Sequence, residues 1–331
     1  MKKLWVFTIS ALAIGFIIGV FYGNRLLTIQ APEREGFEIH QGGFKFVNPL
    51  LECEVGGDNV EFKEIRPFKK NLQELIDSLK ARGWANFSAV YFRDLNNGPW
   101  FGINAKEKFT PASLLKVPLM MAYFKEAETN PKILRDSIRF ENLQDSNSSE
   151  NIRPSSILAP GKIYTVEELI RRTIIYSDNN AYLLLLRHFD QKKLIAIYSD
   201  LGVPVPFDGA DENLMTVKQY ATFFRILFNA SYLNRAMSIK ALELLSKTEF
   251  HDGIVAGVPP NVGVVHKFGE RTYPGKNIEK QMHDCGIVYY PDHPYLICVM
   301  TRGDSFEHLD NSIMEISALV FKNVDEQLGK K

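Results

Sequence analysis

The stretch FTPASLLKVP at residues 109–118 is the most informative part of this chain. It begins with Thr110 and Pro111, a capping hydroxyl followed by a proline at the first helical position, which together predict the start of a helix. Ser113 then lies in the first turn, at the positive end of the helix. Lys116 follows three residues later, and residues at this spacing share a helix face. The stretch therefore predicts a serine hydroxyl within reach of a lysine amine.

Lys116 can accept a proton from Ser113 only when its amine is neutral. Burial and a neighbouring cation both lower the pKa of a lysine, so we expect Lys116 to be neutral at the working pH. Pro118 lies early in the same helix and removes a backbone hydrogen bond, so we expect it to kink the helix. Without further context, Ser113 and Lys116 could also be ordinary residues of a surface helix.

Two further strings occur later in the chain, SDN at residues 177–179 and KFG at residues 267–269. The first lies where one predicted helix ends and another begins, a joint that can present a hydroxyl and an amide to a cleft or simply cap the second helix. The second ends a predicted strand, and its glycine would let a ligand approach the backbone closely. Together with Ser113 and Lys116, the strings supply the groups that acyl transfer requires.

From about residue 70 to residue 325, the chain resembles the class A β-lactamase and penicillin-binding-protein superfamily of serine hydrolases. The resemblance includes the three strings in their order, the full context of residues 109–118, the helix after SDN, and the segment FHDGI at residues 250–254. It implies an enzyme that acts on β-lactams or on the D-Ala-D-Ala end of peptidoglycan stem peptides. It implies no cofactor and no metal.

The resemblance also assigns roles to individual residues of this chain. It implies that Ser113 is the acylated nucleophile and that Lys116 is its base. Fixed backbone donors are needed where negative charge develops, and the resemblance places this oxyanion hole at the N–H groups of Ser113 and Glu270. The remaining implied roles are Ser177 as the proton relay to the leaving nitrogen, Asn179 as a contact to the substrate amide, and Lys267 with Gly269 near the substrate carboxylate.

Two departures from the family pattern concern substrate capture and deacylation. Phe268 stands where the family has a threonine or serine, which removes a carboxylate-binding hydroxyl. The loop glutamate that activates the deacylating water in class A enzymes is missing between Leu201 and Thr216. Asp208 and Glu212 are the candidate carboxylates there, and Glu212 is the first candidate for a replacement base.

These departures leave three functions open. The first is a β-lactamase-type acyl hydrolase in which deacylation is slow. The second is a D-alanyl-D-alanine peptidase, because an intact acylation set without the deacylating base is typical of penicillin-binding peptidases. The third is a penicillin- or muropeptide-binding domain with little turnover.

Hydrophobic periodicity predicts strands at both ends of residues 67–331 with helices inserted between them. A helix from residue 68 and a hairpin at 87–103 open this part, strands at 263–267, 283–290 and 295–301 and a helix at 309–328 close it, and helices at 165–175, 179–188, 216–228 and 236–246 lie between. The pattern predicts an α/β (α+β) fold with an antiparallel sheet formed by both chain ends, flanking helices and an inserted all-helical subdomain. The resemblance implies the β-lactamase/transpeptidase form of this architecture.

The segment before this domain indicates where in the cell the domain is located. Residues 4–22 contain no charge, follow Lys2 and Lys3, and are long enough to span a bilayer. The apolar run continues beyond the small residues at 11–13, which favours an uncleaved anchor over a cleaved signal peptide. We therefore expect a transmembrane signal anchor at 1–27, a linker or small docked extension at 28–66, and an extracytoplasmic domain at 67–331.

Charge and cysteine content bear on nucleic-acid binding and on disulfide formation. The 39 basic residues balance 39 acidic ones without a basic tract, so nucleic-acid binding is not expected. Cys285 and Cys298 fall on neighbouring predicted strands, where a bridge is possible but buried free thiols are expected, because cross-strand neighbours seldom meet disulfide geometry. No role is assigned to Cys53.

Overall fold

The computed structural model describes residues 38–53, 66–96, 99–141, 145–205, 215–273 and 279–328. All of them belong to one compact unit. None of the helices within these ranges is long and apolar enough to cross a membrane. The predicted anchor at residues 4–22 lies outside the described residues, and the domain boundaries at 27 and 66 stay predictions.

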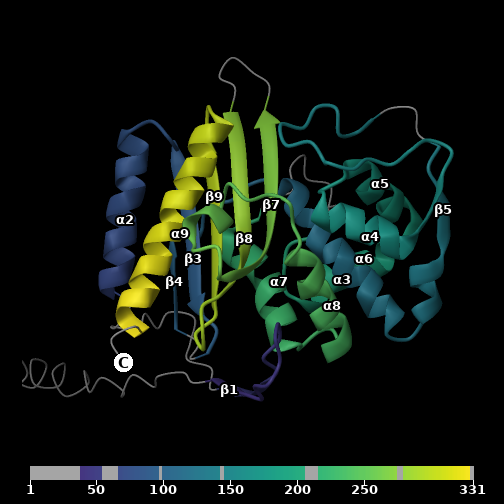
Figure 1. Ribbon diagram of the computed structural model, residues 1–331, viewed down its shortest axis with the longest axis horizontal. Coiled ribbons are helices and arrows are strands. Elements are labelled where there is room, and N and C mark those ends of the chain that lie inside the picture. The colour runs from purple at the N-terminus through teal and green to yellow at the C-terminus, as the bar shows by residue number, and fades with distance from the viewer. Residues whose placement is uncertain are drawn as a thin grey trace, which may run out of the picture. The chain divides into compact units, whose positions relative to one another are not determined.

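The centre of the described unit is a five-stranded antiparallel sheet with the order β4-β3-β9-β8-β7 (Figure 1). The strands from the first part of the domain are β3 (Phe87–Asp94) and β4 (Trp100–Ile103), and those from the last part are β7 (Gly263–Tyr273), β8 (Glu279–Tyr289) and β9 (Tyr295–Gly303). The join between them is the pairing of β3 with β9, in which Val90 lies opposite Val299. The predicted fold class, with one sheet built by both chain ends, is confirmed.

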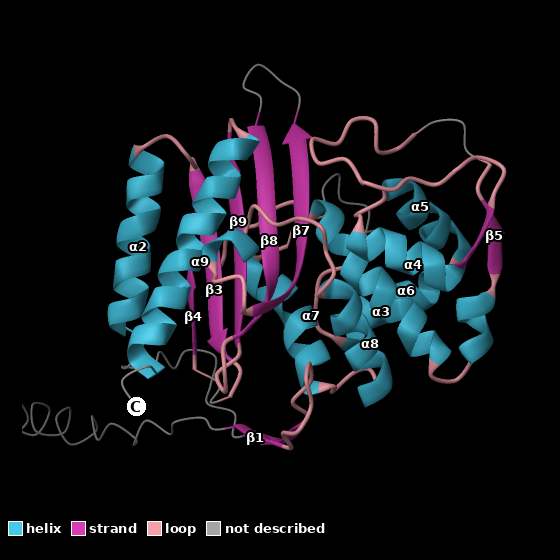
Figure 2. Ribbon diagram, in the orientation of Figure 1, coloured by secondary structure: helices cyan, strands magenta, loops and turns pink. Residues whose placement is uncertain are grey.

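Helices cover the two faces of this sheet. The terminal helices α2 (Arg66–Ala81) and α9 (Phe306–Leu328) lie together on one face, as Figure 2 shows. Successive strand residues point to opposite faces, so Phe92 packs with Leu72 and Ile313 under these helices, whereas Tyr91 belongs to the core on the other side. The core on that second side includes the apolar residues of α7 (Val217–Asn229).

The residues between β4 and β7 form the helical part. It comprises α3 (Lys116–Ala127), α4 (Val166–Ile175), α5 (Asn179–His188), α6 (Gln191–Asp200), α7 and α8 (Arg235–Leu245), with the short strands β5 (Ser137–Arg139) and β6 (Ile163–Thr165). Short 3-10 turns occur at Ala112–Leu115, Pro131–Arg135 and Val255–Gly257. The four predicted helices are present within one or two residues, whereas α6 was not predicted.

The described part of the N-terminal extension packs against the domain. Its strands β1 (Glu38–His40) and β2 (Leu50–Cys53) pair with each other, and Val47 between them is buried. The Asn48 N–H donates to the Phe228 carbonyl at 2.8 Å, and the Tyr289 hydroxyl donates to the Phe46 carbonyl at 2.6 Å. These contacts attach the extension to the end of α7 and the end of β8.

The expectation for the cysteines is wrong in one respect. Cys285 on β8 and Cys298 on β9 lie directly opposite each other, as predicted, but their sulfur atoms form a disulfide. Residues directly opposite each other on neighbouring strands point to the same face of the sheet, and both cysteines lie in the core next to the helical part. Their Cα atoms are 4.0 Å apart. Direct opposition on one face is what brings the thiols close enough to bond.

Candidate active site

The turn that carries Ser113 is held by contacts different from those predicted. Pro111, and not Thr110, is the N-cap of the turn Ala112–Leu115, and it makes no side-chain capping bond. The Thr110 hydroxyl is hydrogen-bonded to the Tyr273 hydroxyl at the end of β7 instead. Ala112 has a φ of 50°, a left-handed conformation that is uncommon for a residue with a Cβ. Ser113 thus lies on a tight turn joined to the edge of the sheet.

Pro118 is accommodated without leaving an orphaned carbonyl. It is the third residue of α3, and a residue with an N–H at this position would bond to the carbonyl of Leu114. That carbonyl accepts a hydrogen bond from the buried Tyr220 hydroxyl at 2.9 Å. A side chain of α7 therefore replaces the bond that the proline removes.

Lys116 lies at the centre of the predicted site. Its Nζ is 2.7 Å from Ser113 Oγ, as the spacing predicted, and 3.0 Å from Ser177 Oγ. It also lies 2.7 Å from the Ser177 carbonyl and 2.6 Å from Asn179 Oδ1. The structure therefore brings together three residues from two distant strings of the sequence around one buried amine.

These contacts suit a neutral lysine that accepts a proton. The two carbonyl oxygens can only accept hydrogen bonds, so they take two N–H groups and leave the remaining position of Nζ to the two hydroxyls. Burial lowers the pKa of Lys116 to about 7, although the carboxylates of Glu150, Asp178 and Glu270 act to raise it. Near pH 7 a substantial fraction of this amine can act as a base.

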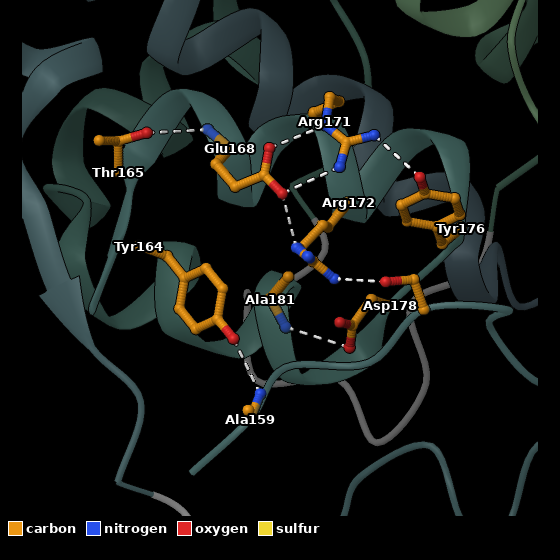
Figure 3. A network of polar contacts seen from close by, with 10 residues as sticks. Ala159, Tyr164, Thr165, Glu168, Arg171, Arg172, Tyr176, Asp178 and Ala181 are labelled. Atoms are coloured by element: carbon orange, nitrogen blue, oxygen red, sulfur yellow. Dashed lines mark hydrogen bonds and ion pairs between the residues drawn. The ribbon is translucent and has the colours of Figure 1, made fainter. Parts of the chain in front are cut away.

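The joint between α4 and α5 presents Ser177 in a left-handed conformation, with a φ of 56°. A network of charged side chains holds the end of α4 (Figure 3). Arg171 bonds to Glu168 and to the Tyr176 hydroxyl, the latter at 2.9 Å, and the Arg172 carbonyl accepts from the N–H of Tyr176 at 3.1 Å. Asp178 caps α5 by accepting from the backbone N–H groups of its first turn. The turn is therefore fixed on both sides of Ser177.

Asn147 is a residue of this site that the sequence analysis missed. It belongs to the polar segment 145–150, and its side chain is almost completely buried. Its amide donates to Asp178 Oδ1 at 2.9 Å and accepts from the Asn179 N–H at 2.7 Å. The only signal in the sequence was a cluster of polar residues, which predicts a solvated loop as readily as a buried one.

Lys267 also reaches Ser177, but it is completely buried. Its Nζ lies 3.0 Å from Ser177 Oγ and 3.2 Å from the Phe268 carbonyl, and 4.0 Å from the centre of the Phe268 ring. Burial, and secondly the nearby Lys116, hold the pKa of Lys267 well below its usual range. Phe268 thus covers the lysine with an aromatic ring where the family has a hydroxyl.

Gly269 packs against the turn that carries Ser113. A Cβ at this position would lie 2.8 Å from the Pro111 carbonyl and 3.1 Å from the Leu114 nitrogen. The close approach of a ligand to this backbone stays a prediction. The absence of a side chain lets β7 pack directly against the nucleophile turn.

These elements enclose a cleft of about 290 Å³. Ser113, Lys116 and Asn179 line it, together with Glu270 and a further glutamate, Glu150, that the sequence analysis did not single out. The remaining lining residues are Ala112, Leu115, Ser149, Asn151, Tyr182, Arg271, Thr272 and Phe306. β7 is the edge strand of the sheet, so it has outward-facing backbone groups that no neighbouring strand pairs.

Two predicted candidates cannot be placed in this cleft. Asp208 and Glu212 lie in the segment 206–214, outside the described residues. Within the described ranges, no group of three histidine, cysteine or acidic side chains is arranged to hold a metal ion.

Comparison with known proteins gives one family and many similar folds. Residues 67–324 match a family model described as the beta-lactamase enzyme family. A search of the curated proteins found no match.

Similar solved structures include a beta lactamase from Xanthomonas campestris, with 18% identity, a TM-score of 0.64, and coverage of 77% of this chain and 97% of the other. A class A beta-lactamase from Mycobacterium abscessus has 22% identity, a TM-score of 0.63, and coverage of 76% and 98%. A variant of PBP-A, in an acyl-enzyme complex with penicillin G, has 19% identity, a TM-score of 0.62, and coverage of 78% and 97%. At these identities the solved structures show the shared fold.

Proposed function

The chain belongs to the beta-lactamase enzyme family, and we propose that it is a serine hydrolase whose Ser113 is acylated by β-lactams. The observation that carries this proposal is the arrangement around Lys116 Nζ, which faces the hydroxyls of Ser113 and Ser177 while two carbonyls fix its orientation. This is the geometry of a nucleophile beside a positioned base.

Acylation would proceed in two steps that return Lys116 to its starting state. Ser113 Oγ bonds to the lactam carbonyl carbon, its proton passes to Lys116 Nζ, and the carbonyl oxygen becomes an oxyanion. The oxyanion then reforms the carbonyl and the C–N bond breaks. The leaving nitrogen takes the proton of Ser177 Oγ, which takes one from Lys116. The product is an ester at Ser113 with Lys116 neutral again.

The backbone N–H groups of Ser113 and Glu270 are our candidates for the donors that stabilise the oxyanion. Lys267 is our candidate for attracting the substrate carboxylate, acting from beneath the Phe268 ring. Because Lys267 is buried and lacks a hydroxyl-bearing neighbour at position 268, we propose that this chain captures the carboxylate more weakly than a class A enzyme does.

Deacylation requires a positioned water and a base. We propose that acylation outpaces deacylation, because the usual loop glutamate is missing from the sequence and general-base help is typically worth about 10²–10⁴-fold. Glu212 stays the first candidate for a substitute. A D-alanyl-D-alanine peptidase would show the same accumulation with β-lactams, and the similarity of the fold to PBP-A keeps that function as the alternative.

Labelling with a fluorescent penicillin tests the nucleophile. Wild-type protein should be labelled, and mass spectrometry should place the adduct on Ser113. Ser113→Ala should abolish labelling, whereas Ser246→Ala should keep it, because Ser246 is an exposed residue at the end of α8. An adduct elsewhere, or undiminished labelling of Ser113→Ala, would refute the proposal.

Turnover of a β-lactam tests slow deacylation, and turnover of a stem peptide separates the β-lactamase from the peptidase. A chromogenic cephalosporin should give a burst equal to the enzyme concentration, followed by slow hydrolysis. Release of D-alanine from a stem peptide ending in D-Ala-D-Ala would favour the peptidase instead. Fast steady-state hydrolysis would contradict slow deacylation, and loss of that hydrolysis in Glu212→Gln would then identify the base.

We also propose that residues 4–22 anchor the enzyme in the cell membrane with the catalytic domain outside the cytoplasm. Fractionation should find the full-length chain in membranes, with its N-terminal peptide retained. A soluble form that begins near residue 14 or residue 24 would show that the segment is a cleaved signal peptide.

A further inference from the structure

Two glutamates line the cleft beside the nucleophile. Glu150 comes from the polar segment before α4, and its Oε1 accepts from Asn179 Nδ2 at 2.8 Å. Glu270 comes from β7, and its Oε1 accepts from the Ile152 N–H at 2.8 Å. Neither forms an ion pair with a lysine or arginine among the residues that the structure describes.

The Glu270 carboxyl group is buried and has too few hydrogen-bond partners. The Glu270 side chain is only 7% exposed, and its Oε2 is buried without a hydrogen-bond partner. Burial, and then the neighbouring Glu150 carboxylate, raise the pKa of Glu270 to about 7, against the opposing effect of the Ile152 N–H. Near pH 7 the Glu270 carboxyl group therefore exchanges its proton.

The neighbouring charged groups offset the negative charge of Glu150 and Glu270 only in part. Lys116 and Lys267 lie near enough to respond to both glutamates, but burial lowers the pKa of each lysine, and Lys267 is inaccessible to solvent. Asp310, on α9, adds a further acidic group on the side of Glu270. Arg271, which follows Glu270 on β7, also lines the cleft, but its side chain is exposed, so water and salt screen its charge. Above pH 7 the negative charge of the two glutamates is therefore only partly balanced.

Glu150 also accepts the hydrogen bond from Asn179 that a substrate would need. The Asn179 amide N–H that it accepts from is the donor our proposed function assigns to the amide of the substrate side chain. The other N–H of this amide donates to the Ser146 carbonyl at 3.3 Å, and that acceptor is part of the backbone. The movable acceptor is the Glu150 side chain, so a substrate that binds this amide displaces the carboxylate and leaves it without that hydrogen bond. A cation on the substrate side chain can compensate the freed carboxylate, whereas an anion is repelled by it.

We infer that Glu150 and Glu270 determine specificity for the charge of the acyl side chain, favouring β-lactams that carry an ammonium group there. This inference rests on the proposed acylation of Ser113 and adds the substrate class to it. Glu150 acts where the side-chain amide binds, and Glu270 contributes the second negative charge from the edge strand.

Three matched penicillins test the inference. The aminopenicillanic acid nucleus is acylated with a pentanoyl, a γ-aminobutanoyl or a glutaryl chain, which are similar in length and end in a methyl, an ammonium or a carboxylate group. Second-order rates of Ser113 acylation are measured near pH 8. We expect about a tenfold advantage of the ammonium form over the neutral one, and about a tenfold disadvantage of the carboxylate form, from charges several ångströms apart in a partly hydrated cleft.

Substitution of the glutamates should remove this selectivity. In Glu150→Gln and Glu270→Gln the three rates should converge, while the backbone N–H of Glu270 is kept. Glu243→Gln, on the exposed surface of α8, is the matched control and should retain the wild-type ratios. Equal rates for the three penicillins in the wild type, or unchanged ratios in both glutamate variants, would overturn the inference.

The dependence of the ratio on pH is a second readout. Protonation of the pair at about pH 5.5 removes one negative charge, so the disadvantage of the glutaryl form relative to the pentanoyl form should shrink. Titration of Lys116 changes both acylation rates by the same factor, because both substrates use the same base. It therefore leaves the ratio of the rates unchanged. Failure of all three penicillins to label Ser113 would refute the proposed function, whereas uniform labelling would refute the charge selectivity alone.

Discussion

At the scale of single residues, Lys116 shows how burial turns a common side chain into a candidate base. Its amine is surrounded by two carbonyls and two hydroxyls and is nearly inaccessible to solvent. The cost of burying a charge shifts its protonation equilibrium towards neutrality. The result is an amine that can exchange a proton near neutral pH.

This environment predicts the pH dependence of acylation. The pKa of Lys116 is lowered to about 7, so the neutral, proton-accepting form increases as the pH rises through 7. The acylation rate should rise between about pH 5 and pH 8 and then level off. Stopped-flow measurements with a fluorescent penicillin give this profile.

Lys116→Arg provides the control, because arginine cannot be deprotonated. Acylation should fall by about 10²–10⁴-fold in this variant. A wild-type rate that is constant over the whole range, or that falls as the pH rises, would contradict the role of Lys116 as the base.

Phe268 is a second residue at which a single side chain decides local chemistry. Its ring packs against Phe250, with ring centres 4.5 Å apart, and covers Lys267. The substitution Phe268→Thr should lower the free energy of unfolding by about 2–4 kcal/mol, because it leaves a cavity in the core. It should also lower KM for carboxylate-bearing β-lactams by restoring a hydroxyl beside Lys267.

Denaturant unfolding and steady-state kinetics separate these two effects. Phe268→Leu is the matched control, since it removes the ring without adding a hydroxyl. Equal KM values for the threonine and leucine variants would show that the hydroxyl contributes nothing to substrate capture.

At the scale of structural elements, the joint between α4 and α5 depends on a loop that is distant in sequence. Asn147 bonds to Asp178 and to the backbone of Asn179, and so connects the segment 145–150 to the start of α5. Asn179 in turn holds Lys116 through its Oδ1. The position of the base therefore depends on a residue that does not contact it.

Asn147→Ala tests this connection. The variant leaves the N–H of Asn179 without its partner, which should lower the free energy of unfolding by about 1–3 kcal/mol. Acylation should also slow, by about tenfold, because Asn179 and Lys116 lose their fixed orientation. Asn234→Ala removes the N-cap of α8 and should cost about 1 kcal/mol without changing acylation. Equal acylation rates in the two variants would contradict a positioning role for Asn147.

At the scale of the whole molecule, the sheet is cross-linked at its centre by the disulfide between β8 and β9. The two cysteines are 13 residues apart in sequence, so the bond closes a short loop of the unfolded chain. A disulfide that closes a loop of this size typically stabilises the folded state by about 3 kcal/mol. Joint replacement, Cys285→Ala with Cys298→Ala, should lower the melting temperature measured by calorimetry.

Cys53→Ala is the matched control and should leave the melting temperature unchanged, since Cys53 has no part in this bond. Mass spectrometry of the denatured protein provides the direct measurement. Alkylation before reduction should modify Cys53 alone, and modification of all three cysteines would show that the disulfide is absent.

The features of this protein that depend on local pattern could be predicted from its sequence. Helical and strand periodicity predicted the sheet from both chain ends and the inserted helices, and the spacing of Ser113 and Lys116 predicted a contact that the structure shows at 2.7 Å. Within one turn of helix, backbone geometry alone fixes which side chains meet, so such contacts can be read from the chain.

Individual side-chain contacts between distant segments were not predictable from local pattern. Only the fold brings Glu150 to the cleft and Asn147 to the start of α5. It also replaces the bond lost at Pro118 with Tyr220 and packs the nucleophile turn against Gly269. It also pairs two thiols that local pattern indicated would stay free. The reason is physical: burial, pKa and orphaned hydrogen-bond groups are properties of the packed environment, and a residue's neighbours in sequence do not specify that environment.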